Sequence, residues 1–139
     1  MTNHISEVGN LTRDPELKFL NNGGTSVRIG LAVNRRWQNR QTQEWEERTS
    51  FFTVVGYGAL AENAANSLKQ GDRVVVIGRL EQRDWTTEAG EKKSVIEIIA
   101  DEIAPSLAYA STVVSKNAKP EGRSTGNARP RYDAPEEAF

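Results

Sequence analysis

The sequence contains no cysteine and a single histidine, His4. Disulfide frameworks and thiolate metal sites are therefore excluded, and one imidazole does not make a histidine metal cluster. We expect neither a metal nor another cofactor. No apolar run approaches the length of a membrane span, and MTNHISEVGNL lacks the basic and apolar regions of a signal peptide. We therefore expect a soluble, cytoplasmic protein that does not bind membranes.

The motifs of the common enzyme classes are also missing. The sequence contains no phosphate-cradling GxxxxGK[ST], no GxSxG and no dinucleotide-type GxGxxG. Glu44, Glu46 and Glu47 form a small acidic cluster, but acids in a polar loop are usually a solvated surface. We do not expect an enzyme.

A strong net charge is a further absence. The 18 basic and 19 acidic side chains give a formal net charge of −1. Nucleic acids are bound mainly through cations that neutralise phosphates, so the bulk charge speaks mildly against such a partner. A nucleic-acid hypothesis depends instead on where the cations and aromatic rings lie.

The composition changes near Thr112. Aliphatic runs recur regularly before it, whereas residues 113–139 are rich in small, polar and charged residues and have no apolar period. Such a segment buries too little apolar surface to offset the entropy of ordering. The sequence predicts one folded domain over residues 1–112 and a disordered tail over residues 113–139.

The apolar pattern of the domain is mostly that of β-strands. Residues 27–34 alternate between apolar and polar or small side chains, which indicates a strand with one face inward. Asn21–Gly24 is a turn after an earlier strand, and Gly9 and Asp14-Pro15 predict a bend or bulge in that strand. The predicted strands are 5–19, 27–34, 51–57, 73–80 and 94–103, with Ala89-Gly90 in the last turn.

One segment has helical spacing instead. Leu60, Ala64 and Leu68 recur every four residues within 59–69, and Gly71 is placed to end a helix. Three strands, a helix and two strands follow the order of the OB-fold. We therefore predict an all-β protein, a five-stranded Greek-key OB-fold barrel with one short helix between strands three and four.

Trp37 and Trp85 stand beside basic residues at the expected strand ends. Rings set among cations are typical of proteins that bind single-stranded nucleic acid, because bases stack on the rings while cations contact phosphates. The alternative is that each indole only closes an end of the barrel. The basic residues near these indoles are Arg35, Arg36, Arg83, Lys92 and Lys93.

The strand predicted over 51–57 carries an aromatic residue on each face. Phe51 and Tyr57 share one face, and Phe52 lies on the other. If the first face points outward, it offers two more stacking platforms; the alternative is that both rings pack under a loop and the helix. Trp45, flanked by acids, is expected to pack within its own hairpin. Five scattered cations could line a groove or simply be solvated: Arg13, Lys18, Arg28, Arg73 and Arg79.

The segment DAPEEAF combines acidic side chains with an aromatic ring. Carboxylates suit a basic partner surface, and a phenyl ring fills an apolar pocket; a frayed chain end is the alternative. The residues predicted to contact such a partner are Asp133, Pro135, Glu136, Glu137 and Phe139.

Three stretches together resemble the bacterial single-stranded DNA-binding proteins: VGNLTRDPELKFLNNGG, SFFTVVGYGALAENAANSLKQGDRVVVIGRLEQRDW and RDWTTEAGEKKSVIEIIADEI. The resemblance covers nearly the whole chain, and IAPSLAYA is similar to actinobacterial or phage-borne members. The resemblance implies that Trp37, Phe51, Tyr57 and Trp85 stack on bases. It also implies a homotetramer and a tail tip that recruits replication and repair proteins.

The sequence thus predicts a protein that binds and protects single-stranded DNA in replication, recombination and repair, without regard to base sequence. Two alternatives stay open, because the fold does not determine the ligand. One is an OB-fold that binds RNA or an oligosaccharide. The other is an interaction module of the replication machinery with weak DNA affinity.

Overall fold

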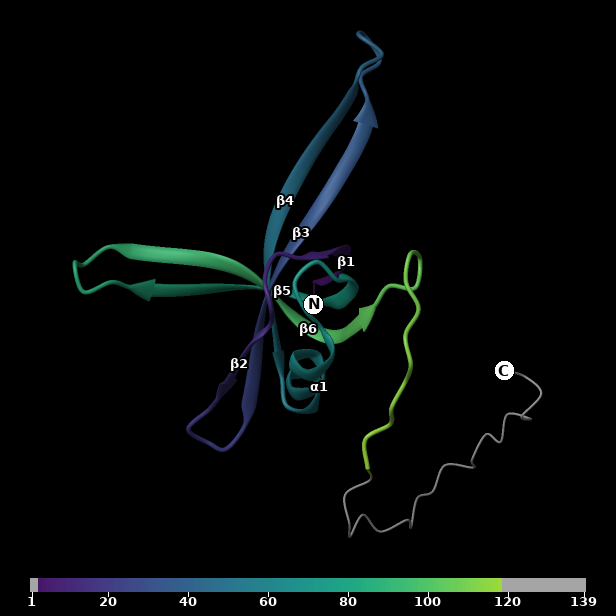
Figure 1. Cartoon of the computed structure of the whole chain (residues 1–139). Coiled ribbons are helices and arrows are strands. Elements are labelled where there is room, and N and C mark those ends of the chain that lie inside the picture. Colours follow the sequence, from purple (N-terminus) through teal and green to yellow (C-terminus); the bar gives the residue numbers. More distant parts are fainter. Residues whose placement is uncertain (1–2, 119–139) are drawn as a thin grey trace.

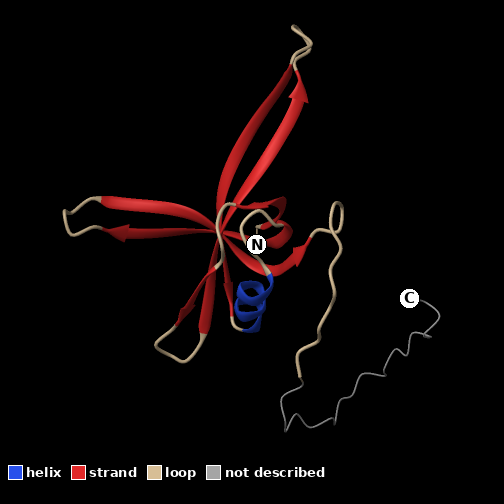
Figure 2. Cartoon of the chain, viewed as in Figure 1, coloured by secondary structure: helices blue, strands red, loops and turns tan. Residues whose placement is uncertain are grey.

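The computed structural model describes residues 3–118, which form six strands and one helix (Figures 1 and 2). The predicted partner tip at 133–139 lies outside the described residues. The elements are β1 (His4–Leu11), β2 (Glu16–Phe19), β3 (Thr25–Gln38), β4 (Trp45–Tyr57), α1 (Ala59–Ser67), β5 (Arg73–Thr86) and β6 (Lys92–Pro105).

The strands form a single sheet that closes into a barrel. Their order is β1-β5-β6-β4-β3-β2, and β1 closes the sheet by pairing with β3 at Asn10 and Leu11. The neighbours β4 and β6 run parallel, whereas the other pairs are antiparallel. With α1 between the third and fourth predicted strands, this arrangement agrees with the predicted OB-fold. The predicted first strand is divided into β1 and β2, and Asp14-Pro15 lies in the break.

Gly9 immediately precedes the point where β1 begins to pair with β3, at Asn10. Gly9 lies inside β1, where a Cβ atom would collide with the backbone carbonyl of Ala32 in β3. Glycine is needed there because the two backbones approach closely. A further irregularity, which was not predicted, lies between β5 and β6, where the register passes from Ile77–Glu102 to Gly78–Ala100 and leaves Asp101 as an extra residue.

Aliphatic side chains from β3, β4, β5 and β6 fill the barrel. Alternate residues of a strand point to one face. The apolar residues of the alternation predicted in β3 are the ones that point into the barrel, and they form the inward row of this strand. The largest fully buried side chains are Val27, Ile29, Leu31, Val54, Val74, Val76 and Ile98.

The helix α1 covers one end of the core. Its Ala64 and the following Leu68 are buried and Leu60 packs against them, as the four-residue spacing predicted. The helix is two residues shorter than predicted, because Leu68 is extended. Gly71 does not end the helix; it lies in the turn before β5 with a φ of 90°, and its N–H donates to the Leu11 carbonyl.

Hairpins extend from the barrel as arms (Figure 1). The β3–β4 arm stays paired out to Gln38–Trp45, and the β5–β6 arm out to Thr86–Lys92. These strands were predicted to stop near the barrel, so the predictions were several residues too short. Beyond the barrel neither face is buried, and the apolar alternation ends although backbone pairing continues.

Candidate nucleic-acid interface

The sheet side turned away from the core forms a continuous outer face. Cross-strand partners share a face, so Phe51 opposite Ala32, and Tyr57 opposite Ser26, point away from the inward row of β3. The cross-strand partners in β2, β6 and β5 show by the same rule which of their side chains lie on this face. Its side chains include Lys18, Arg28, Phe51, Tyr57, Arg83, Trp85, Lys93 and Glu97.

Two aromatic rings stand exposed on β4. Phe51 is 73% exposed and Tyr57 53% exposed, while Phe52 packs against the core. The prediction that the Phe51–Tyr57 face points outward is confirmed. The exposed rings give the outer face two flat apolar surfaces.

A hollow of about 150 Å³ lies beside Tyr57 on the outer face. Glu97 of β6 lines it and is only 5% exposed. Its Oε1 accepts a hydrogen bond of 3.0 Å from Nε of Arg83, and its Oε2 lies 3.6 Å from Nη1 of Arg28. One buried carboxylate therefore holds guanidinium groups from β3 and β5 around the hollow.

Sequence reasoning missed the part played by Glu97. The signal was an acid in the middle of the aliphatic run Val95–Ile99, since a buried carboxylate requires a cationic partner. The partners, however, come from strands distant in sequence. Arg28, treated as one of five scattered cations, is one of them.

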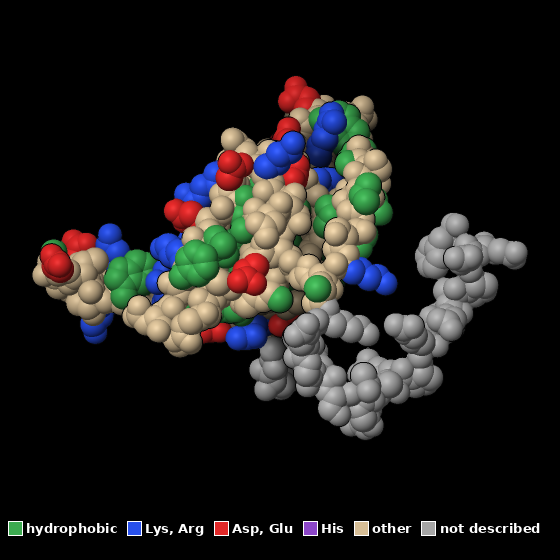
Figure 3. All heavy atoms as spheres, turned by 60° about the horizontal axis from the view of Figure 1, so that its bottom comes forward, with side chains coloured by type: hydrophobic (Ala, Val, Ile, Leu, Met, Phe, Trp, Pro, Cys, Tyr) green, Lys and Arg blue, Asp and Glu red, His purple; other side chains and the backbone are tan. Residues whose placement is uncertain are grey.

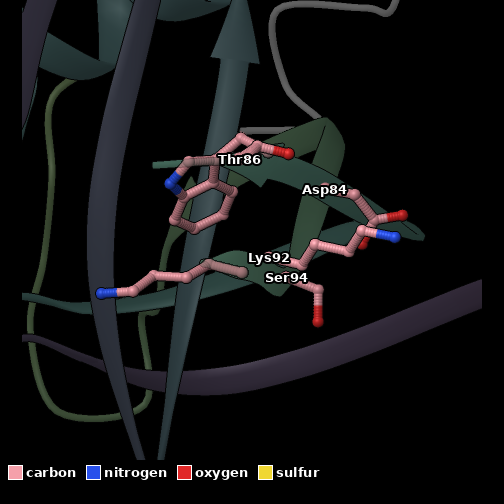
Figure 4. A pocket seen from close by; sticks show the side chains of 6 residues that line it. Asp84, Thr86, Lys92 and Ser94 are labelled. Carbon is pink, nitrogen blue, oxygen red and sulfur yellow. The ribbon is translucent and has the colours of Figure 1, made fainter. Parts of the chain in front are cut away.

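The β5–β6 arm brings together Arg83, Trp85 and Lys93. The guanidinium carbon of Arg83 lies 5.0 Å from the centroid of the Trp85 ring, and Lys93 is the cross-strand partner of Trp85. An open groove of about 500 Å³ runs beside this pair. Lys92 lies on the reverse side of the arm with Asp84 and Ser94 (Figure 4). The structure thus separates two lysines that are adjacent in the sequence.

The β3–β4 arm carries Trp37 on its reverse side. Trp37 pairs with Glu46, and Arg35 lies 5.9 Å from its ring on that same side. Both residues therefore face away from Phe51. Arg36, which follows Arg35, belongs to the side of Phe51.

Trp45 was predicted to pack within its own hairpin, and the structure agrees with this only in part. Arg36 of the same hairpin does contact its ring, at 4.8 Å from the centroid. The side chain is nevertheless 61% exposed, compared with 39% for Trp37 and 41% for Trp85. Contact within the hairpin therefore does not bury this indole.

Hydrophobic and basic side chains lie side by side over the barrel and along the arm at the left of Figure 3. Two of the other predicted groove cations have partners: Arg73 lies against the Tyr109 ring, and Arg79 pairs with Glu81 on the same side of β5 as Arg83. The described residues contain no cluster of histidine, cysteine or acidic side chains that could hold a metal. They also contain no helix long and apolar enough to cross a membrane.

Comparison with known proteins settles the family. The model of the single-strand binding protein family matches residues 2–106. The chain belongs to this family. The single-strand binding family binds DNA and performs no reaction, which agrees with the expectation that the chain is not an enzyme.

Relatives in the single-strand binding family include actinobacterial proteins, in line with the resemblance noted above. The single-stranded DNA-binding protein of Mycobacterium tuberculosis is 44% identical over 124 residues, covering 88% of this chain and 76% of that protein. The Corynebacterium glutamicum protein is 44% identical over 114 residues, covering 81% and 51%.

The solved structures that are similar to this chain include two single-stranded DNA-binding proteins. The small single-stranded DNA-binding protein of Streptomyces coelicolor has a TM-score of 0.65 and 39% identity, covering 79% of this chain and 99% of that one. The Plasmodium falciparum SSB in complex with ssDNA has a TM-score of 0.70 and 29% identity, covering 76% and 95%. Both support the assignment of the barrel as an OB-fold.

Proposed function

We propose that this chain binds and protects single-stranded DNA during replication, recombination and repair, without regard to base sequence. The observation that carries the proposal is the outer face of the barrel. There Tyr57 lines one hollow with Arg28 and Arg83, and the exposed ring of Phe51 lies on the same face.

Base stacking explains binding that tolerates any sequence. Every base has a π-face, so a ring binds all bases, whereas hydrogen bonds to base edges would select among them. We assign the stacking role to Trp37, Phe51, Tyr57 and Trp85. Phosphates are contacted by Arg35, Arg36, Arg83, Lys92 and Lys93, which lie on the two long arms.

These residues occupy both sides of the arms. Arg83, Trp85 and Lys93 continue the outer face, whereas Trp37 and Lys92 lie on reverse sides. The arms stand clear of the barrel (Figure 1), and DNA that passes around an arm reaches both of its sides. We therefore propose that the strand wraps the arms instead of following the outer face alone.

We also propose that the chain forms a homotetramer. Within the described chain, β1 pairs on one side with β5, and its other edge is free from His4 to Gly9. Val8 and Ile77 are apolar and exposed on the neighbouring surface of β1 and β5. An open strand edge beside apolar side chains favours association with another copy.

The acidic residues and Phe139 of the segment 133–139 suit a basic partner with an apolar pocket. We propose that this segment recruits replication and repair proteins. We also propose that the protein acts in the cytoplasm, in association with the nucleoid.

Fluorescence titration with oligo-dT tests the proposed function. Stacking on indoles quenches their emission, so we expect saturable quenching that weakens with salt, with a log–log slope of about −0.7 per phosphate contacted. Competition by oligo-U of equal length separates DNA binding from RNA binding. Absence of binding at low salt would contradict the proposal and favour a protein-interaction module.

Phe51→Ala tests the outer face directly. Loss of one stacking ring should weaken oligo-dT binding by about 1–3 kcal/mol. Phe19→Ala is the matched control, because Phe19 is also highly exposed but lies on the inward-facing side of β2. Equal losses in both variants would show that the outer face has no special role.

A further inference from the structure

The aromatic residues of β4 form a regular series on one side of the strand. Six positions separate Tyr57 from Phe51, and six more separate Phe51 from Trp45. Even spacing keeps all three on the same side. At about 3.3 Å per residue, neighbouring rings are about 20 Å apart along β4. The series runs from the barrel along the β3–β4 arm towards its tip.

Trp45 has the surroundings of the assigned stacking residues. Its ring lies 4.8 Å from the guanidinium carbon of Arg36, as the Trp85 ring lies 5.0 Å from that of Arg83. Trp45 is also the most exposed of the three indoles. A guanidinium over one side of a ring leaves the other side open, so the pair offers a stacking surface next to a cation for phosphate.

The acids that flank Trp45 in the sequence do not surround its ring. Glu46 points to the reverse side of the arm, where its carboxylate accepts a hydrogen bond from the Asn39 side chain. Glu44 lies in the loop before β4. Glu47 shares the side of Trp45 but is the cross-strand partner of Arg36. Within the described residues no ion pair joins Glu47 to Arg36, so the Arg36 guanidinium stays available to a phosphate.

We propose that Trp45 is a further base-stacking position, next to the phosphate contact assigned above to Arg36. The inference rests on the proposed function, because it extends the same DNA path along the arm. DNA bound at Tyr57 and Phe51 must continue about 20 Å further to reach Trp45. Trp45 therefore contributes to the binding of long oligonucleotides and not of short ones.

A variant with one indole tests the contact directly. In the double variant Trp37→Phe, Trp85→Phe, Trp45 is the sole tryptophan, and phenylalanine keeps a ring at the other two positions. Binding of fluorescein-labelled oligo-dT, measured by anisotropy, reports association independently of the indole. We expect quenching of Trp45 emission that saturates at the same concentration as the anisotropy. Binding without a change in Trp45 emission would overturn the inference and leave the proposed function intact.

Trp45→Ala in the otherwise unchanged chain supplies a second measurement. We expect affinity for an oligo-dT of about 16 nucleotides to fall about five-fold or more, and affinity for one of about 6 nucleotides to stay unchanged. An equal loss at both lengths, with a lowered Tm, would mean that Trp45 only stabilises the arm, which overturns the inference. If the unchanged chain binds neither oligonucleotide, the proposed function fails and the inference fails with it.

Discussion

At the scale of the residue, Glu97 places a negative charge under a surface that has to attract phosphates. Burial of a carboxylate is unfavourable unless its charge is paired, and Arg28 and Arg83 supply the pairing. Arg83 also covers the Trp85 ring. The carboxylate therefore orders one arginine against a proposed stacking ring before DNA arrives, which lowers the entropy lost on binding.

Glu97→Gln should change the salt dependence of binding. The amide removes the charge that competes with phosphate for the two arginines, so the log–log slope should become steeper by about 0.7 for each further phosphate that an arginine binds. Salt titrations of oligo-dT binding measure this slope. Glu62→Gln is the control, since it makes the same change in charge on the helix α1. A slope equal to that of the control would show that neither arginine binds a further phosphate.

At the scale of the element, the extra residue Asp101 decides which side chains of β6 reach the outer face. Ile98 and Ala100 are buried before the irregularity, and Ile103 packs against the core after it. A regular strand would instead turn Glu97 inward together with Ile103. The bulge thus keeps aliphatic residues in the core along the whole strand and delivers Glu97 to Arg28 and Arg83.

Gly78→Ala should destabilise the fold at this irregularity. A Cβ atom on Gly78 would collide with the carbonyl oxygen of Ile99, which is backbone and has little room to move. We expect the free energy of unfolding to fall by about 1–3 kcal/mol, measured by urea denaturation. Gly24→Ala is the control, because the nearest atom there belongs to the Asn22 side chain. Equal midpoints for both variants would contradict the close approach.

At the scale of the whole molecule, the formal net charge of −1 does not describe the binding surface. Three guanidinium groups on the arms lie within 6 Å of indoles, so each of these rings has a cation beside it. The charges close to the binding surface, and not the net charge of the whole chain, determine contact with phosphate, because solvent-exposed charges are screened beyond about 10 Å. The near-neutral composition is therefore compatible with DNA binding.

Ile77→Asp should weaken the proposed tetramer. An aspartate at this exposed position beside the free edge of β1 would have to be desolvated on association. Sedimentation velocity should show smaller species than for the unchanged chain. Ile96→Asp serves as control, since Ile96 is also exposed but lies on the β5–β6 arm. Identical sedimentation of the two variants would place the contact between copies elsewhere.

Much of this protein follows from local sequence. Alternation over 27–34 and four-residue spacing over 59–69 predicted the core strand and the helix, because burial of one face imposes those periods. The outward face of Phe51 and Tyr57 was predicted in the same way and is confirmed by their exposure. The OB-fold followed from the order of these elements.

Tertiary structure decided what depends on pairing between distant strands. The long arms have no buried face and hence no apolar period, so their paired length was not visible in the sequence. The register separates Lys92 from Trp85 and exposes Trp45, and the bulge at Asp101 turns Glu97 towards two arginines. Periodicity reports the side of a strand on which a residue lies, whereas only the register between strands reports which residue it faces.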